Sequence, residues 1–252
     1  MDDLRNVSSR IRLTFQFFCV ISALLVFQED LHIFLGSIIQ NISDETFSRL
    51  IIVLIICLLV ISWVWVINLF NFMDGMDGIT AVQVSSIAIC TNIFSIMGLI
   101  STDFLYFGLI ILTIFLAFFS VNKPPAKIFL GDVGSIPIGF IIGFIIIYNG
   151  IKYDIFIPFL ICMMYYILDS TITLLLRLLK KENIFEAHSS HFYQKVLRKG
   201  YSHNFVLNRL ILLNLALMFL SFLSIDFPFT SLLIAVFLSG FLIYFFESRR
   251  QQ

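Results

Sequence analysis

Charge is scarce in this sequence of 252 residues, and neither sign of charge prevails. Asp, Glu, Lys and Arg make up 13% of the residues, and the 16 acidic side chains balance the 16 basic ones. A chain without excess positive charge lacks the attraction by which proteins bind the phosphate backbone of nucleic acids. We therefore expect no nucleic-acid partner.

A cysteine framework and a secretion signal are also missing. The four cysteines, Cys19, Cys57, Cys90 and Cys162, each lie alone in an apolar run, so the sequence suggests no disulfide framework and no thiolate metal site. The first five residues are acidic where a signal peptide would be basic, so we expect no cleaved signal.

Apolar residues are abundant instead. They form 60% of the chain, aromatic residues form 16%, and the mean hydropathy is +1.00. No soluble domain of this length needs so much apolar surface, so the composition indicates a polytopic protein in a lipid bilayer. Eight apolar runs are each about long enough to span a bilayer, at residues 12–27, 50–70, 79–98, 104–121, 134–149, 154–178, 206–225 and 229–247.

These runs predict an all-α fold, a polytopic membrane helix bundle with about eight transmembrane helices. Residues 1–252 contain no linker or internal repeat, so we expect a single membrane-embedded domain. The stretch from Gln28 to Arg49 is predicted to be a loop. All Lys and Arg residues except Arg49 and Lys152 fall on one side of the membrane under this count, and the positive-inside rule makes that side cytoplasmic.

Polar residues gather in four clusters, each separated from the next by two spans. They are Asp2-Asp3, Asn68 to Gly78, Asn122 to Ser135, and His188 to His203. An even number of spans returns the chain to the same side, so all four clusters are predicted to face the cytoplasm. Helix caps have no reason to gather on one side, whereas parts of one active site do.

The second cluster contains Asn71, Asp74 and Asp77 among the glycines Gly75 and Gly78. Carboxylate and amide oxygens are hard ligands that suit Mg²⁺ or Mn²⁺ and a phosphate-bearing substrate. Glycine allows tight turns and a close approach of backbone to ligand. Alternatively, these acids mark only where a helix reaches water.

The third cluster contains Asp132 and Ser135 near the start of an apolar run, and Lys123 and Lys127 precede them in the sequence. Asp132 or Ser135 could be a helix N-cap. The start of a helix with glycine-rich backbone and nearby lysines is equally a phosphate site.

The fourth cluster holds His188 and His191, which share one face if the segment is helical. The basic residues on both flanks favour a role of the two histidines in binding a diphosphate. The alternative is that both histidines are simply solvated. Zinc would need a third ligand of zinc type, and the neighbouring sequence offers none. Asp169 lies inside an apolar run, where a carboxylate is costly, and is expected to face the bundle or to pair with a polar neighbour.

Together, four motifs in this order are similar to those of the polyprenyl-phosphate N-acetylhexosamine-1-phosphate transferases, glycosyltransferase family 4. The chain most resembles the branch of bacterial enzymes that initiate O-antigen. The motifs are Asp2-Asp3 with a following Ser, Asn71-Phe-Met-Asp74-Gly-Met-Asp77-Gly, Pro125-Ala-Lys127-Ile-Phe-Leu-Gly-Asp132-Val-Gly-Ser135, and Phe185-Glu-Ala-His188-Ser-Ser-His191-Phe-Tyr.

The resemblance implies transfer of a sugar 1-phosphate from a UDP-N-acetylhexosamine to undecaprenyl phosphate, with release of UMP and with Mg²⁺ or Mn²⁺ as cofactor. It implies an enzyme of the bacterial inner membrane whose active site faces the cytoplasm. The product would initiate an envelope glycan such as O-antigen.

Roles of single residues follow from the resemblance by position. Asn71 and Asp132 match the residues that hold the metal, and Asp132 is counted as catalytic. Asp77, with Asp74, matches the uridine side of the donor site.

The remaining matches concern the substrates. Asp2 and Asp3 match a catalytic pair that contacts or deprotonates the lipid phosphate. His188 and His191 match a loop that binds the diphosphate or the sugar. Asn122 and Lys127 are further expected substrate-binding residues, and the positive charge of Lys127 would offset repulsion between the anionic substrates.

Two departures from the family pattern lead to further expectations. Ser189 stands where this branch commonly carries Arg, so a fixed guanidinium is missing from the histidine motif. The family also carries further helices before the Asp-Asp pair. We therefore expect Met1 to be internal to a longer frame or the gene to be truncated, and the chain alone to form no lipid-linked sugar.

Alternative functions are an inactive remnant of the family and an ion-coupled membrane transporter. The transporter would place polar groups at mid-membrane on several spans, and only Asp169 is a clear case. The CDP-alcohol phosphotransferases also use Asp-Gly repeats, but they need an Arg soon afterwards, which residues 81–83 do not supply.

Overall fold

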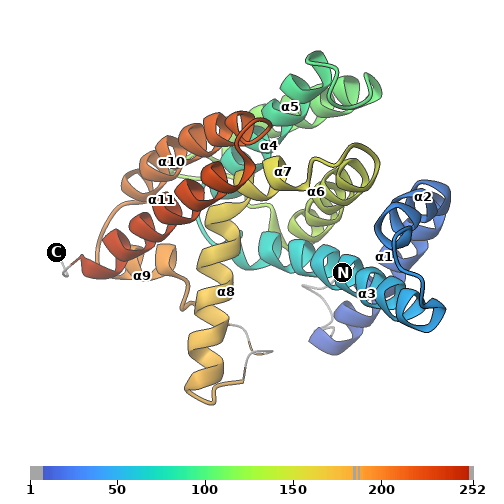
Figure 1. The fold of residues 1–252 in the computed structure, drawn as a ribbon. Coiled ribbons are helices and arrows are strands. Elements are labelled where there is room, and N and C mark those ends of the chain that lie inside the picture. Colours follow the sequence, from blue (N-terminus) through green and yellow to red (C-terminus); the bar gives the residue numbers. More distant parts are fainter. Residues whose placement is uncertain (1–7, 184–185, 187, 250–252) are drawn as a thin grey trace. The chain divides into compact units, whose positions relative to one another are not determined.

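The computed structural model describes residues 8–183, 186 and 188–249. Within these ranges the chain forms eleven α-helices and no β-strand (Figure 1). Seven helices are long and apolar enough to cross a membrane, and a bent helix pair raises the number to as many as eight. The prediction of an all-α polytopic membrane fold with about eight spans is confirmed.

The helices are α1 (Ser9–Val26), α2 (Gln28–Ile39), α3 (Glu45–Met73), α4 (Ile79–Ile96), α5 (Asp103–Asn122), α6 (Gly131–Tyr153), α7 (Phe156–Cys162), α8 (Met164–Leu179), α9 (Phe192–Arg198), α10 (His203–Leu223) and α11 (Pro228–Ser248).

Contacts between residues divide the chain into two compact units. Unit 1 comprises Met1–Asn68 and Asp132–Phe156, and unit 2 comprises Leu69–Gly131 and Ile157–Gln252. The boundary falls inside α3, so one continuous helix contributes to both units. The single domain that we expected over residues 1–252 stays a prediction.

Unit 1 is built on an apolar core to which α1, α2, α3 and α6 contribute. Trp63 of α3 is fully buried, and its ring stacks on Phe140 of α6 at 5.1 Å between centroids. The indole Nε1–H donates to the Phe140 carbonyl at 2.9 Å, which satisfies the one polar atom of this side chain. A Cβ on Gly143 would collide with the indole, so this glycine is what lets α6 approach Trp63.

Unit 2 is a second group of packed helices. α4 packs against α5 and α10, and α11 packs against α8, α9 and α10. Although α4 is almost entirely buried, it carries many small polar side chains, and several of these bond within their own helix. Ser86 donates to the Val82 carbonyl and Thr91 to the Ile87 carbonyl, so buried hydroxyls keep a partner.

The apolar run at 154–178 differs from the single span that the sequence predicts. It forms α7 and α8, bent by 70° at Met163. A break leaves helix carbonyls without their usual donors. Here the Gln83 side chain donates to the Cys162 carbonyl, at the end of α7, at 2.8 Å. Ser221 of α10 also donates to the Pro158 carbonyl inside α7 at 2.7 Å.

The predicted loop from Gln28 to Arg49 is also wrong in part, because its first half is helix α2 and its end, from Glu45, belongs to α3. Glu29 and Asp30 lie in the first turn, where acidic side chains favour a helix. Leu31 and Leu35, one turn apart, are buried in the core of unit 1, so one apolar face stabilises the helix.

Candidate functional site

The polar segment after α3 is held in place by its glycines. Asn71 lies in the last turn of α3, and Asp74 and Asp77 follow in the connection to α4. Gly78 precedes α4 with φ of +78°, a left-handed conformation that glycine adopts at little cost. A Cβ there would also lie only 2.9 Å from the Leu207 side chain. Tight packing therefore defines the path of this segment.

Asn122 ties the α3–α4 connection to the residues after α5. Its side chain is buried, Oδ1 accepts the Gly78 N–H at 2.9 Å, and Nδ2 donates to the Ile128 carbonyl at 2.8 Å. Both ends of the amide are thus bonded to backbone. These contacts position two loops, and the predicted contact of Asn122 with substrate stays a prediction.

Asp77 brings a third segment to the same place. Its Oδ2 accepts the Ala126 N–H at 3.0 Å and lies 3.2 Å from Nδ1 of His203, the first residue of α10. The side chain is 13% exposed. Parts of the second, third and fourth polar clusters therefore meet at one carboxylate, as the sequence predicts for parts of one site.

Asp74 and Lys127 have different surroundings. Oδ1 of Asp74 accepts the Thr80 hydroxyl at 2.6 Å, which links the half-buried carboxylate to the first turn of α4. Lys127 is exposed, and its backbone N–H donates to the Val121 carbonyl at 2.8 Å. Because its ammonium group is open to solvent, Lys127 can meet an anion that approaches this face.

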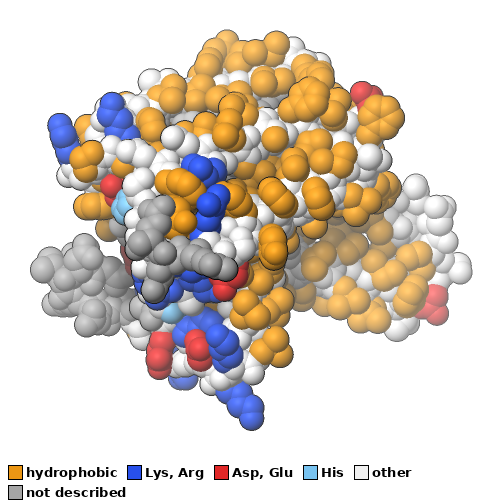
Figure 2. Space-filling model, turned by 90° about the vertical axis from the view of Figure 1, so that its left-hand side faces the viewer, with side chains coloured by type: hydrophobic (Ala, Val, Ile, Leu, Met, Phe, Trp, Pro, Cys, Tyr) orange, Lys and Arg blue, Asp and Glu red, His pale blue; other side chains and the backbone are white. Residues whose placement is uncertain are grey.

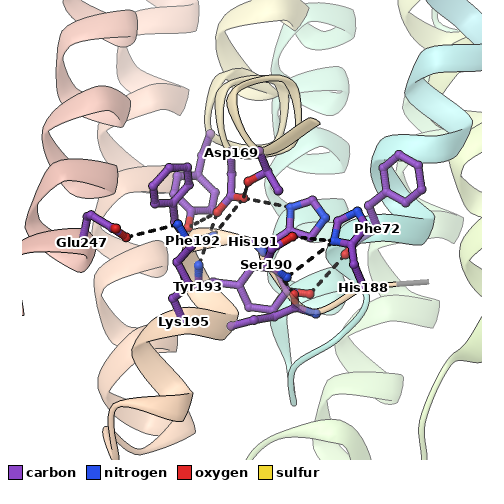
Figure 3. A network of polar contacts seen from close by, with 12 residues as sticks. Phe72, Asp169, His188, Ser190, His191, Phe192, Tyr193, Lys195 and Glu247 are labelled. Carbon is purple, nitrogen blue, oxygen red and sulfur yellow. Dashed lines mark hydrogen bonds and ion pairs between the residues drawn. The ribbon is translucent and has the colours of Figure 1, made fainter. Parts of the chain in front are cut away.

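Asp169 of α8 anchors the histidine segment (Figure 3). The carboxylate is fully buried, and its Oδ1 lies 2.9 Å from His191 Nδ1 and accepts the Phe192 N–H at 3.2 Å. Its Oδ2 accepts the Tyr165 hydroxyl at 3.0 Å and the Tyr193 N–H at 3.4 Å. A buried carboxylate is tolerated when donors surround it. The expected pairing of Asp169 with a polar neighbour is confirmed.

The two histidines of the motif have unequal exposure. His191 is 1% exposed and faces Asp169 with Nδ1, whereas His188 is half-buried. The two rings stack with centroids 5.0 Å apart, and Phe72 of α3 lies 6.1 Å from the His191 ring and 6.4 Å from the His188 ring. His191 is thus an inner residue of the motif and His188 an outer one (Figure 3).

Tyr193 locks the histidine segment against the α3–α4 connection. Its hydroxyl donates to the Phe72 carbonyl at 3.1 Å, and a Cβ on Gly75 would collide with that hydroxyl. Burial, together with the nearby charge of Asp169, raises the pKa of Tyr193. The phenol therefore stays protonated and remains a donor throughout the physiological pH range.

Arg198 lies beside the position where the motif departs from the family pattern. Its Nη1 donates to Ser189 Oγ at 3.3 Å, and both side chains are exposed. Arg198 ends α9, nine residues after Ser189. A guanidinium group is therefore present beside position 189, although a different residue supplies it.

Asp132 belongs to the first turn of α6, in unit 1. Its Oδ2 accepts Arg12 Nη1 at 2.5 Å, and the Asp132 side chain is 39% exposed. Asn71 belongs to unit 2, so the predicted sharing of one metal ion by Asn71 and Asp132 stays a prediction. Asp2 and Asp3 lie outside the described residues.

Three residues of this site were missed or given no role in the sequence analysis: Phe72, Tyr193 and Arg198. Phe72 and Tyr193 are aromatic residues in a chain with 30 Phe and 8 Tyr, so their type alone gave no signal. Arg198 was counted only as a flanking charge. Its distance from Ser189 depends on the path of the chain between Ser189 and α9, which sequence alone does not fix.

Comparison with known proteins adds a family to this geometry. The model of glycosyl transferase family 4 matches residues 1–150, which include the first three polar clusters but not the histidine motif. A Bacillus subtilis (strain 168) protein named probable undecaprenyl-phosphate N-acetylglucosaminyl 1-phosphate transferase is 31% identical over 150 residues, which are 58% of this chain and 41% of that protein.

Two further relatives carry different names. The Methanocaldococcus jannaschii protein MJ1113, named as a glycosyltransferase, is 32% identical over 175 residues, 68% of this chain and 50% of that protein. The phospho-N-acetylmuramoyl-pentapeptide-transferase of Enterococcus hirae is 39% identical over 77 residues, 29% of this chain and 22% of that protein.

This chain spans half or less of the length of each of these relatives. No solved structure matches it. The family model nevertheless covers more than half of the 252 residues. The chain belongs to glycosyl transferase family 4.

Proposed function

We propose that the protein transfers a sugar 1-phosphate from a UDP-N-acetylhexosamine to undecaprenyl phosphate and releases UMP. The family and the name of the Bacillus subtilis relative support this class of reaction. The observation that carries the proposal is the meeting of three polar segments at Asp77, where the Ala126 N–H and His203 converge on its carboxylate.

The reaction joins two anions. An oxygen of the lipid phosphate attacks the phosphorus that carries the sugar, the bond from that phosphorus to the UMP oxygen breaks, and UMP leaves with the electron pair. The barrier includes repulsion between the two phosphates, so positive charge at this face lowers it. The exposed Lys127 and the half-buried His188 are placed to supply such charge.

The hydrogen bonds and burial of each residue decide which part of the donor we propose that it binds. Asp74 and Asp77, both fixed by hydrogen bonds from the protein, are proposed on the uridine side. His188 is proposed to contact the diphosphate or the sugar directly, because it is the outer histidine of the stacked pair. His191 is buried against Asp169, and its proposed contribution is to hold His188 in place.

Two further assignments concern the substrates, and only the first rests on the family pattern alone. Asp2 and Asp3 would contact or deprotonate the lipid phosphate. Asn122 would act near the substrate through the two loops that it fastens. This indirect role suits an amide whose oxygen and nitrogen are both bonded to backbone.

We extend the proposal to a divalent cation, Mg²⁺ or Mn²⁺, held by Asn71 and Asp132. Asp132 fits such an ion because its carboxylate is partly exposed and binds a positive group, the Arg12 guanidinium. In the described part of the chain no three His, Cys, Asp or Glu side chains form a group of metal ligands, so Asn oxygen, water and phosphate oxygens would complete the shell. When bound, the cation would neutralise the diphosphate and polarise the bond to UMP.

The proposed location is the bacterial inner membrane, with the site on the cytoplasmic side. The placement of Lys and Arg residues supports this orientation. Cytoplasmic UDP-sugars could then reach the polar segments, and the lipid-linked product could begin an envelope glycan such as O-antigen.

The test is a transfer assay in membranes that contain the protein, supplied with undecaprenyl phosphate, Mg²⁺ and either UDP-N-acetylglucosamine or UDP-N-acetylgalactosamine. We expect release of UMP and a lipid-linked sugar with at least one donor when the full reading frame that contains these residues is expressed. Asp132→Asn should lower turnover by about 100-fold or more, because it removes a charge needed in the transition state.

Asp103→Asn is the matched control. Asp103 is an exposed acid at the start of α5, bonded to Ser101, and lies outside the proposed site. It should leave turnover unchanged. Near-normal turnover of Asp132→Asn would overturn the metal assignment, and the absence of UMP release with both donors would overturn the transfer itself.

A further inference from the structure

A cluster of arginine and aromatic side chains lies where α10 begins and α11 ends, apart from the residues assigned to transfer. It consists of Tyr201, Phe205, Arg209, Phe245 and Arg249, and we call it the arginine–aromatic cluster. α10 and α11 pack side by side, which brings the two ends of this stretch of chain together (Figure 1).

Both guanidinium groups gather around the same two rings. The Arg209 guanidinium carbon lies 3.3 Å from the Phe205 ring centroid and 6.0 Å from that of Phe245. The Arg249 carbon lies 4.1 Å from the Phe245 centroid and 5.8 Å from that of Phe205. Tyr201 adds a third ring, 4.7 Å from Phe205. Cation–π contact holds each arginine in place.

Neither arginine has a carboxylate partner among the described residues. Arg209 Nη1 donates to the Phe205 carbonyl at 2.8 Å. The acid closest in sequence to Arg249 is Glu247, and Lys195 engages it at 3.4 Å. Two positive groups therefore share a small region of rings, and no acidic side chain in the described part of the chain balances them, which favours an anionic ligand.

Further positive charge surrounds the cluster. Lys199 Nζ donates to the Glu247 carbonyl at 2.6 Å at the end of α11. Figure 2 views the molecule from the side on which α11 ends in Figure 1, and Lys and Arg side chains gather there among apolar ones. This local excess of Lys and Arg contrasts with the balanced charge of the whole chain.

Apolar side chains extend from the cluster along both helices. Leu212, one turn beyond Arg209, is 67% exposed, and Phe241, one turn before Phe245, is 58% exposed. Both helices are long and apolar enough to span a membrane. A positively charged end on an exposed apolar surface matches a molecule with an anionic head and hydrocarbon chains.

We propose that the arginine–aromatic cluster binds the phosphodiester headgroup of an anionic glycerophospholipid, whose acyl chains lie along α10 and α11. Planar guanidinium groups bind phosphate oxygens through paired N–H donors, and stacking on rings pre-orients them for this contact. Basic sites between membrane helices bind anionic headgroups in this way.

The test measures lipid binding by the purified full chain with native mass spectrometry, comparing phosphatidylglycerol with phosphatidylcholine. The wild-type chain should retain phosphatidylglycerol preferentially. The Arg209→Gln/Arg249→Gln variant should bind it roughly 30-fold more weakly, at about 1 kcal/mol for each lost charge. Arg209→Lys/Arg249→Lys should lose only part of the affinity, because it keeps the charge but not the planar donors.

Arg49→Gln/Lys180→Gln is the control, since it removes two exposed charges from elsewhere on the chain and should bind as the wild type does. Thermal melting without lipid shows whether each variant folds. Should the double Gln variant not fold, the wild type alone still decides: its melting temperature must rise more with phosphatidylglycerol than with phosphatidylcholine, and the difference must shrink at high salt.

Equal binding of both lipids by the wild type would overturn the proposal, as would unchanged binding by a folded double Gln variant. Displacement of phosphatidylglycerol by a lower concentration of undecaprenyl phosphate would also overturn it, because the cluster would then belong to the acceptor lipid. None of these measurements requires transfer activity, so failure of the proposed reaction would leave this result independent.

Discussion

At the scale of single residues, Asp169 fixes the start of helix α9. Helix α9 has seven residues, too few to be stable as an isolated helix in water. It is fixed because Asp169 accepts the N–H groups of Phe192 and Tyr193 at its start and faces His191 Nδ1. The position of the histidine motif therefore depends on a carboxylate more than 20 residues earlier in the chain.

We predict that Asp169→Asn destabilises the protein by about 2–4 kcal/mol, because the amide NH₂ group must face backbone N–H donors inside the fold. Thermal melting in detergent would show the loss as a lower Tm. The KM for the UDP-sugar should also rise, since His188 loses its support. Ser170→Ala is the control: Ser170 is equally buried and its Oγ has no partner in the described chain. Equal melting temperatures for the two variants would contradict the prediction.

Arg198 and Ser189 offer a second test at this scale. In the resembling enzymes an Arg commonly occupies position 189, and here Arg198 reaches Ser189 Oγ from α9. We predict that Arg198→Gln raises the KM for the UDP-sugar by about tenfold, the effect of losing one charge-assisted hydrogen bond. Ser189→Arg should lower KM in the wild-type background.

The double variant Ser189→Arg/Arg198→Gln distinguishes this role from a structural one. It should return KM close to the wild-type value, because a guanidinium group again lies at position 189. Lys180→Gln removes an exposed charge elsewhere and serves as the control. An unchanged KM in Arg198→Gln, or no recovery in the double variant, would contradict the prediction. It would show that a guanidinium group at this position does not bind the UDP-sugar.

The residue types of the site were largely visible in the sequence, but their partners were not. Repeated Asp-Gly and paired His stand out because such residues are costly near lipid. The contact of Asn122 with substrate stays a prediction, but nothing in the sequence indicated that its amide bonds Gly78, 44 residues away, and Ile128. Hydrogen bonds over such separations depend on helix packing, about which a single sequence carries little direct information.

At the scale of elements, the break between α7 and α8 depends on a side chain from another helix. Gln83 of α4 donates to the Cys162 carbonyl, which the bend leaves without a helical donor. The apolar run at 154–178 has the length of one span, and hydropathy cannot report a bend stabilised by a residue 79 positions away. Length and apolarity thus predicted where the spans lie but not how they bend.

We predict that Gln83→Leu lowers stability by about 1–3 kcal/mol, the cost of leaving a buried carbonyl unsatisfied. Ser86→Ala in the same helix is the matched control, because the Ser86 hydroxyl bonds only to the Val82 carbonyl of α4. It should change stability by less than about 0.5 kcal/mol. Similar melting curves for both variants would show that Gln83 does not hold the bend.

At the scale of the whole molecule, the ends of the helices in unit 2 allow a test of which side of the membrane the polar segments face. Arg249, just after α11, lies near Tyr201 and Phe205 at the start of α10, so these helix ends share one side. His203 lies beside Asp77, which also accepts the Ala126 N–H. The turn after α10, at Asp226, must then lie toward the other end of the α10–α11 pair. The polar segments of unit 2 thus gather at one end of its helices, as the even spacing of polar clusters predicted.

We predict that this end faces the cytoplasm, because Lys and Arg concentrate there. In a background with Cys19 and Cys57 replaced by Ala, single cysteines at Lys123 and Ser189 should react with a membrane-impermeant maleimide only after permeabilisation. Cysteines at Thr102 and Asp226, all four sites being exposed in the structure, should react in intact cells. If all four positions were labelled from the opposite side to the one predicted, the orientation would be the reverse of our prediction. Cytoplasmic UDP-sugars could then not be the donors. Labelling of positions 123 and 189 from different sides would instead contradict the meeting of polar segments on which the proposed site depends.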